Sequence, residues 1–232
     1  NRPLSTDGFA LNPSLALYLP LWKKDGATIS SDDAYGSTCS VTGALWTPQG
    51  RKFDGVDDVI SIGTRISTLA PPLPITLIVW INKQSGGGDG GGSNGGIISL
   101  NRSATLAGPF MNFGTKSGST YPINLTYGDN AGGYRAKATT AQVVTDGYTY
   151  HLAGVIRGAT DMSIYVNGDE VGGSYSGTGG ALAWNGGVGN IGRTPTPDFY
   201  FKGTIGEARV YLQNFTPQDI KRDYLVTKWR YQ

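Results

Sequence analysis

Residues that form metal centres and cross-links are almost missing from this 232-residue sequence. It contains one cysteine, Cys39, and one histidine, His151. One cysteine cannot form an intramolecular disulfide or a cysteine-based zinc site, and one histidine cannot build a multi-histidine metal centre. No apolar stretch approaches the roughly 18 residues that a membrane-spanning helix needs. We therefore expect neither kind of metal centre and no membrane insertion.

Charge is also scarce and nearly balanced. Charged residues make up 16% of the chain, against roughly 25% in ordinary soluble domains. The 19 basic and 17 acidic residues leave a net charge of +2. Such a chain has no electrostatic footprint for nucleic acid and no polybasic patch for a membrane surface. We expect no nucleic-acid partner.

Glutamate occurs only at Glu170 and Glu207, 37 residues apart. Retaining glycoside hydrolysis needs two carboxyl groups about 5 Å apart, which alternate positions on one strand would supply. Neither glutamate lies in such a pair. Asp57 and Asp58 are adjacent, so on a strand they would point to opposite faces. A Ser-His-Asp site would rest entirely on His151. The sequence therefore predicts a protein that is not an enzyme.

Glycine and aromatic residues are abundant, with 36 glycines and 11% aromatics, a composition typical of all-β proteins with many turns. Short alternating or apolar segments predict strands along the whole chain. They are 15–22, 41–46, 53–63, 75–82, 96–100, 109–113, 123–127, 134–139, 148–157, 162–166, 189–193 and 203–212. This pattern predicts one β-sandwich over residues 15–232, preceded by an N-terminal arm of residues 1–14.

Within this pattern, the run ITLIVWIN (75–82) has no polar face, which predicts a central strand with Trp80 buried. Tyr18, Trp22 and Trp46 also lie in strand patterns and are expected in the core.

Two further local signals concern the last third of the chain. Asn167-Gly168 is a strong signal for a two-residue hairpin turn, because both residues tolerate positive φ. Thr216 is a good N-cap and is followed by proline, which predicts a short C-terminal helix.

The tract from Gly86 to Gly96 contains a G-x-G-x-x-G match. A dinucleotide site needs a helix after this motif, so that the helix N-terminus can face the phosphates. A strand-like segment follows here, so we interpret the tract as a loop between two strands.

Several segments, taken in order, resemble the pattern of laminin-G-like jelly rolls of the concanavalin A-like lectin/glucanase superfamily. The resemblance covers residues 15–225 and rests on FDGVDDVISIG, ITLIVWIN, YHLAGVIRG, MSIYVNGDEV, NIGR and FKGTIGEARVYLQNFTPQDIKRDYL. It implies an all-β fold in which two antiparallel sheets of six or seven strands pack face to face as a jelly-roll β-sandwich. It also places His151 within a strand of the core sheet, where a structural role is expected. Gly206 departs from the pattern, because the family usually has aspartate at this place.

The FDGVDD segment offers a candidate metal site. Asp54, Asp57 and Asp58 cluster there, and the resemblance places Glu207 nearby. Carboxylate oxygens are ligands that Ca²⁺ prefers. Alternatively, the aspartates cap the turn by accepting hydrogen bonds from backbone N–H groups, and the missing aspartate at position 206 favours this second interpretation.

Loop aromatics and amides are candidates for sugar recognition, because rings pack on sugar C–H faces and amides bond hydroxyl groups. The candidate ligand-binding residues are Trp184, Tyr175, Tyr134, Tyr121 and Asn185. Trp184 lies between glycines and is either a stacking platform or a side chain that closes one end of the sandwich. The sequence leaves both readings open.

We therefore expect a non-catalytic recognition or adhesion module that binds a glycan or a protein, outside the cell or on a virus particle. The alternative is a structural subunit, such as a capsid or appendage decoration protein or a filament component. In that case the polar arm of residues 1–14 would contact neighbouring subunits. The fold cannot separate the two, since it hosts both kinds of function.

Overall fold

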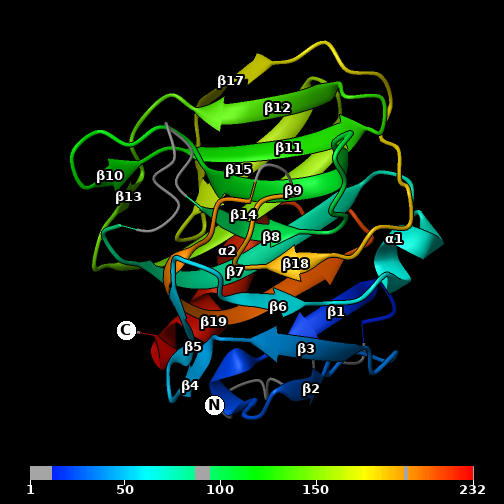
Figure 1. The fold of residues 1–232 in the computed structure, drawn as a ribbon. Coiled ribbons are helices and arrows are strands. Elements are labelled where there is room, and N and C mark those ends of the chain that lie inside the picture. The colour runs from blue at the N-terminus through cyan, green and yellow to red at the C-terminus, as the bar shows by residue number, and fades with distance from the viewer. Residues whose placement is uncertain (1–11, 87–94, 196–197, 232) are drawn as a thin grey trace.

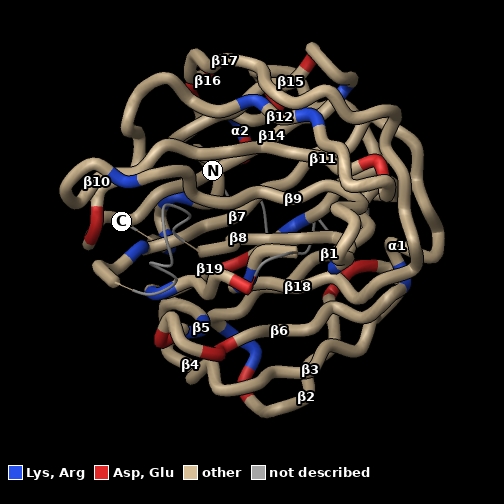
Figure 2. Tube along the Cα trace, turned by 45° about the horizontal axis from the view of Figure 1, so that its top comes forward, with Lys and Arg blue, Asp and Glu red and all other residues tan. Residues whose placement is uncertain are grey.

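The computed structural model describes residues 12–86, 95–195 and 198–231, which form two large antiparallel sheets stacked as a β-sandwich (Figure 1). The outer part of the predicted arm, residues 1–11, and residues 87–94 of the glycine tract lie outside the described residues. Charged positions of both signs are scattered over the strands and loops (Figure 2). None of the described helices is long and apolar enough to cross a membrane.

The first sheet has eight strands in the described part of the chain. In spatial order they are β16 (Asp169–Val171), β15 (Asp161–Val166), β14 (Thr149–Gly158), β7 (Ile75–Lys83), β19 (Lys202–Tyr211), β5 (Gly50–Asp54) and β4 (Leu45–Thr47), with β1 (Leu15–Leu19) paired to β19. β19 therefore pairs with β5 at its start and with β1 at its end.

The second sheet has nine strands in the same described residues. Their order is β17 (Gly173–Ser176), β12 (Tyr134–Thr139), β11 (Ile123–Asp129), β9 (Ala107–Phe113), β8 (Gly96–Ser99), β18 (Asn190–Ile191), β6 (Val59–Ser61), β3 (Thr38–Thr42) and β2 (Thr28–Ser30). β10 (Thr120–Tyr121) and β13 (Val144–Thr145) form a separate pair. Both sheets are larger than the six or seven strands that the resemblance implies, because short edge strands extend them.

Two helices and two 3₁₀ turns complete the described structure. They are η2 (Leu21–Lys23), α1 (Arg65–Leu69), α2 (Pro217–Thr227) and η3 (Lys228–Arg230). The prediction of α2 is confirmed. The Thr216 side chain accepts a hydrogen bond from the Asp219 backbone N–H, and the Asp219 carboxylate accepts one from the Thr216 N–H. This capping box satisfies backbone donors that a helix start leaves free.

The central-strand prediction is confirmed for β7. Val79 and Ile81 point into the core between the sheets, while Trp80 points to the outer face of the first sheet, and all three are at most 1% exposed. Apolar groups are buried on both faces because the second sheet covers one and α2 covers the other. The Asn167-Gly168 turn is also confirmed, with positive φ at both residues between β15 and β16.

Several strand boundaries differ from the prediction, and two of the differences have a clear local cause. β1 ends at Leu19, because Pro20 has no backbone N–H for a ladder, and Trp22 lies in η2. The segment 41–46 is divided between β3 and β4 around Gly43, whose φ of +73° favours glycine. The prediction that Trp22 and Trp46 are core residues is wrong, since Trp22 is half-buried and Trp46 is 40% exposed.

Candidate functional site

Strand register places polar residues in rows across the outer face of the first sheet. Alternate residues of β14, β7 and β19 point to this face, which gives one row of His151, Trp80 and Glu207. A second row, nearer the ends of the same three strands, contains Thr149, Asn82 and Thr204. α2 and the residues after it cover the first row but not the second.

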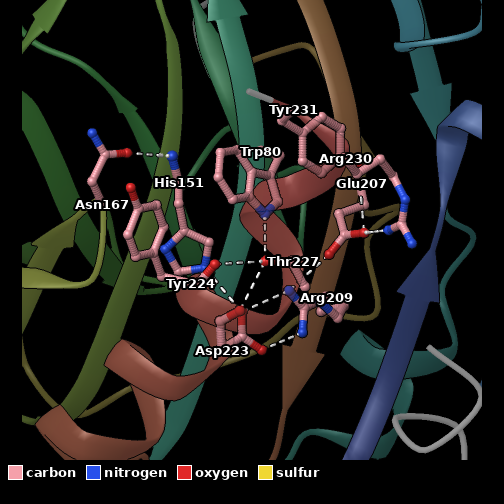
Figure 3. A network of polar contacts seen from close by, with 10 residues as sticks. All are labelled: Trp80, His151, Asn167, Glu207, Arg209, Asp223, Tyr224, Thr227, Arg230 and Tyr231. Atoms are coloured by element: carbon pink, nitrogen blue, oxygen red, sulfur yellow. Dashed lines mark hydrogen bonds and ion pairs between the residues drawn. The ribbon is translucent and has the colours of Figure 1, made fainter. Parts of the chain in front are cut away.

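Four charged or titratable side chains form a buried network between the sheet and α2 (Figure 3). The Arg209 guanidinium donates to both carboxylate oxygens of Asp223 on α2, with Nη2 2.8 Å from Oδ1. The same guanidinium is 2.7 Å from the Glu207 carboxylate, and His151 Nε2 is 2.9 Å from Asp223 Oδ1. All four side chains are nearly inaccessible to solvent. Because buried charges require partners, this network fixes the position of α2.

The electrostatics of the network favour the charged forms of Arg209 and Asp223. Burial alone would raise the pKa of the Asp223 carboxyl, but Arg209 and His151 offset this and lower the pKa to about 2. Burial likewise opposes the charge on Arg209, and the carboxylates of Asp223 and Glu207 nevertheless raise its pKa well above the ordinary value. Arg209 and Asp223 therefore form a buried ion pair at the centre of this network of His151, Glu207, Arg209 and Asp223, which we call the clamp. The contact of His151 with Asp223 agrees with the structural role expected for this histidine.

The clamp continues to the end of the chain. Arg230 Nη1 donates to Glu207 Oε2 at 3.2 Å, and the Tyr231 hydroxyl lies 3.3 Å from the same oxygen. The Tyr231 ring stacks on Trp80, with ring centroids 4.6 Å apart. It also lies over Gly206, where a Cβ atom would come within 2.3 Å of the Tyr231 ring. Glycine at position 206 therefore provides the space that Tyr231 occupies.

A pocket of about 220 Å³ lies beside Tyr231, over the uncovered polar row. Most of its lining residues carry an uncharged amide or hydroxyl group or an aromatic ring. The others are one arginine, one isoleucine and one glycine. They are Gln49, Trp80, Ile81, Asn82, Thr149, Thr204, Gly206, Arg230 and Tyr231. The register of three strands and the last turn of the chain together build this pocket.

Three of the five tryptophans meet next to this pocket, and we call Trp22, Trp46 and Trp229 with Arg230 the aromatic corner. The Arg230 guanidinium lies 4.1 Å from the Trp22 ring centroid and 4.9 Å from that of Trp229. Trp46 Nε1 donates to the Trp22 carbonyl oxygen at 3.1 Å. Trp229 is 63% exposed and Trp46 40%. The aromatic corner is thus a surface of exposed rings held by a cation and a hydrogen bond.

The loop residues that sequence analysis favoured have mainly internal contacts. Trp184 packs against the core and its Nε1 donates to the Pro71 carbonyl oxygen at 3.1 Å, so its indole closes one end of the sandwich. Asn185 bonds Asn101 and Ser103 through its side chain, at 2.6 Å each. These two candidates stabilise the 177–189 loop and present no free stacking platform.

The three candidate tyrosines do not form one site. Tyr121 is fully buried in the core, so its ring has no exposed face for a ligand. Tyr134 and Tyr175 are 39% and 41% exposed. Tyr175 is the register partner of Lys137, so these two side chains lie on the same face of the sheet. Tyr134 is three positions before Lys137 on β12 and therefore lies on the other face. The Tyr175 hydroxyl also bonds the backbone of Met162.

Asp54, Asp57 and Asp58 do come together. One carboxylate oxygen from each lies within 4.8 Å of the others, a geometry that could hold a cation. Part of this set caps the turn: Asp58 accepts from the Asp54 N–H at 2.7 Å, and Asp54 from the Val56 N–H at 2.8 Å. Burial raises the pKa of the Asp58 carboxyl, and the two neighbouring carboxylates add to this.

Glu207 does not belong to the aspartate cluster, so its expected place near the cluster is wrong. Its register partner on β7 is Trp80, whereas Asp54 pairs with Lys202 at the start of β19. The Glu207 carboxylate instead faces Arg209 and Arg230.

Sequence reasoning missed the aromatic corner and the pocket. Trp22 and Trp46 look like core residues because they sit beside apolar strand residues, and Trp229 lies after the helix pattern. One signal was present: Gly206 is the position where the chain departs from the resemblance, and it lies in the pocket wall.

Comparison with known proteins supports the fold assignment. The family model described as "Laminin_G_3: Concanavalin A-like lectin/glucanases superfamily" matches residues 54–221. A search of curated proteins finds no match.

Solved structures share the fold at low identity. A mutant of Trypanosoma rangeli sialidase with trans-sialidase activity aligns with a TM-score of 0.66 and 16% identity, over 94% of this chain and 34% of the sialidase. The binding domain of botulinum neurotoxin serotype D aligns with a TM-score of 0.65 and 13% identity, over 92% and 52%. The chain thus spans about a third of the sialidase and about half of the toxin domain.

A third structure is similar to this chain over nearly its whole length. Domain 4 of AbnA, an extracellular arabinanase from Geobacillus stearothermophilus, was solved in complex with arabinotriose. It aligns with a TM-score of 0.61 and 15% identity, over 90% of this chain and 97% of that domain. At these identities the three structures show a common fold.

Proposed function

Since the chain belongs to the concanavalin A-like lectin/glucanase superfamily, we propose that it is a non-catalytic carbohydrate-binding module whose ligand lies on the aromatic corner. The observation that carries this proposal is the exposure of Trp229 and Trp46 on either side of Trp22. The Arg230 guanidinium lies over the Trp22 and Trp229 rings, and Trp46 bonds the Trp22 carbonyl oxygen. Exposed indole rings are costly to leave in water and offer flat apolar faces for sugar C–H groups.

The corner is built to stay in place without ligand. The Arg230 side chain is only 9% exposed and bonds the buried Glu207 carboxylate, and the clamp below ties this carboxylate to Arg209 and α2. Preorganised rings lose little conformational entropy when a ligand binds. The clamp therefore supports recognition at a rigid surface.

The positions of the two glutamates favour binding over hydrolysis. Glu170 lies on β16 and Glu207 on β19, four strand positions apart in the same sheet. A spacing of about 4.8 Å per strand separates them by about 19 Å, whereas glycosidases hold their two carboxyl groups about 5–9.5 Å apart. Glu207 is also fully buried among arginines.

The AbnA domain offers independent support by analogy. It is a single domain of nearly the same extent as this chain, and its title describes a complex with arabinotriose. We infer that this chain uses the same kind of scaffold for an oligosaccharide.

Binding should be measured on a printed glycan panel and then by calorimetry, with wild type, Trp229→Ala and Trp46→Ala. We expect micromolar-to-millimolar binding that either substitution weakens about tenfold, with an unchanged fold by circular dichroism. Tyr35→Ala is the matched control, since Tyr35 is 51% exposed and stacks on Arg65 outside the corner. Absence of binding, or hydrolysis of a bound polysaccharide, would contradict the proposal.

A further inference from the structure

We propose that the pocket beside Tyr231 binds one terminal residue of a neutral oligosaccharide, while the following residues of the ligand lie on the aromatic corner. This inference rests on the proposed function and adds the ligand class and its orientation. The pocket and the corner are continuous, because Arg230 lines the pocket and contacts the rings of Trp22 and Trp229.

The pocket floor presents fixed hydrogen-bonding groups. The Asn82 Nδ2 atom donates to the Gly147 carbonyl oxygen at 3.0 Å and to Thr149 Oγ1 at 3.1 Å. These two bonds fix the amide plane. Within the residues that the structure describes, Asn82 Oδ1 and the side chains of Gln49 and Thr204 have no hydrogen-bond partner, so they can serve ligand hydroxyl groups.

The pocket wall is aromatic, because Tyr231 lies over Gly206 and against Trp80. An aspartate at position 206, as in the resembling pattern, would place its side chain where the Tyr231 ring lies. It would also put a negative charge beside the Glu207 carboxylate. The glycine therefore makes both the stacking of Tyr231 and the pocket possible.

The charges around the pocket favour a neutral ligand. Four of the lining residues, Gln49, Asn82, Thr149 and Thr204, are uncharged and polar. The one lining cation, Arg230, already pairs with Glu207. Lys52 follows Thr204 in the same cross-strand row but is exposed and does not line the pocket. The carboxylate of an acidic sugar would thus find no unpaired cation among the described residues that line the pocket.

The size of the pocket limits it to one sugar ring. Its volume of about 220 Å³ is below the roughly 300 Å³ at which pockets for drug-sized ligands begin. The other sugar residues of a longer oligosaccharide must lie outside the pocket. On the side of the pocket that Arg230 lines, they would meet the rings of the aromatic corner. Recognition is therefore directed at a chain end.

The test measures affinity for wild type, Asn82→Ala, Thr204→Val and Gly206→Asp by calorimetry. The probes are arabinotriose, xylotriose, cellotriose, mannotriose and, as the acidic member, 3′-sialyllactose. For the neutral probe that binds wild type best, we expect Asn82→Ala and Thr204→Val each to weaken binding roughly fivefold to tenfold, as loss of a ligand hydrogen bond does. Gly206→Asp should abolish it.

Thr160→Val, in the exposed turn between β14 and β15, is the matched control and should bind as wild type does. Melting temperatures identify any variant that fails to fold. If Gly206→Asp is unfolded, the two floor variants decide the result.

Three outcomes would overturn the inference. Wild-type affinity in both floor variants would exclude the pocket while the proposed carbohydrate binding stands. Preference for 3′-sialyllactose would overturn the neutral ligand class. Failure of wild type to bind any member of the panel would overturn the proposed function, and the inference with it.

Discussion

The indole Nε1 of Trp80 donates a hydrogen bond of 2.9 Å to Thr227 Oγ1, which joins the central strand of the first sheet to the last turn of α2. Both residues are fully buried. Thr227 in turn donates to the Asp223 carbonyl oxygen of the same helix at 2.8 Å. The indole is therefore both a packing element and the donor that fixes the C-terminal segment.

We expect Trp80→Ala to lower the free energy of unfolding by about 3–5 kcal/mol, through lost burial and a cavity. Thr227→Val keeps the shape but leaves the indole N–H without its acceptor, and should cost about 1–3 kcal/mol. Urea denaturation measures both. A loss under about 1 kcal/mol for Trp80→Ala would contradict the central-strand assignment.

The Arg209–Asp223 pair should behave as a buried ion pair. Asp223→Leu removes the main partner of a guanidinium with no access to solvent, and we expect a loss of about 3–5 kcal/mol. The double variant Arg209→Met/Asp223→Leu removes both charges and should be more stable than the single one. If the double variant instead lost the sum of the losses in Asp223→Leu and Arg209→Met, the pair would not be coupled.

The lowered pKa of Asp223 predicts an acid-sensitive clamp. Its pKa falls from an ordinary 3.8 to about 2 in the folded protein, because Arg209 and His151 outweigh burial. A lowered folded-state pKa contributes stability that is present above about pH 4 and is lost as the pH falls towards 2, here about 2 kcal/mol. Urea unfolding between pH 5 and roughly pH 2 measures this. Asp223→Asn should show a flatter acid limb, and an equally steep limb would contradict the assignment.

The aspartate cluster allows a decisive ion test. Turn capping by Asp54 and Asp58 predicts that Asp58→Ala is destabilised by about 1 kcal/mol or more. It also predicts that the wild-type melting temperature does not respond to calcium. A rise with calcium that a chelator reverses and Asp57→Asn removes would instead establish a cation site. Thermal scans across a calcium titration distinguish the two.

Trp184→Ala should reduce stability and leave sugar affinity unchanged. The Trp184 ring packs on the core and on Gly108, and its N–H bonds Pro71. Losing these contacts should cost about 2–4 kcal/mol. Calorimetric binding, measured well below the melting temperature, is the check. If Trp184→Ala lost sugar binding but kept its stability, Trp184 and not the aromatic corner would be the binding surface.

Local chemistry determined much of the fold before any tertiary contact was known. The apolar run 75–82 has no polar face and can only be a central strand. Asn167-Gly168 tolerates positive φ at both residues, and Thr216 with Asp219 forms a capping box. The order of such segments, together with the resemblance, predicted the β-sandwich. Each of these features depends on residues close together in sequence.

The candidate site depends on contacts that no local pattern contains. Trp22 and Trp229 are more than 200 residues apart and meet because Arg230, paired with Glu207, lies against both rings. Trp46 joins them through its hydrogen bond to the Trp22 carbonyl oxygen. Trp184 looked like a free platform because its partner, Pro71, lies 113 residues away. Tyr121 looked like a loop residue, but its ring packs against Phe113 and its hydroxyl bonds Asp146.

By itself, then, the sequence determined most of the strands, the hairpin and the capped helix, because backbone preference and burial pattern are local properties. The tertiary structure alone decided which aromatics are exposed, that Glu207 belongs to an arginine clamp and not to the aspartates, and why position 206 is glycine. These depend on the register of β19 against β7 and on where the chain returns after α2. Long-range packing sets both.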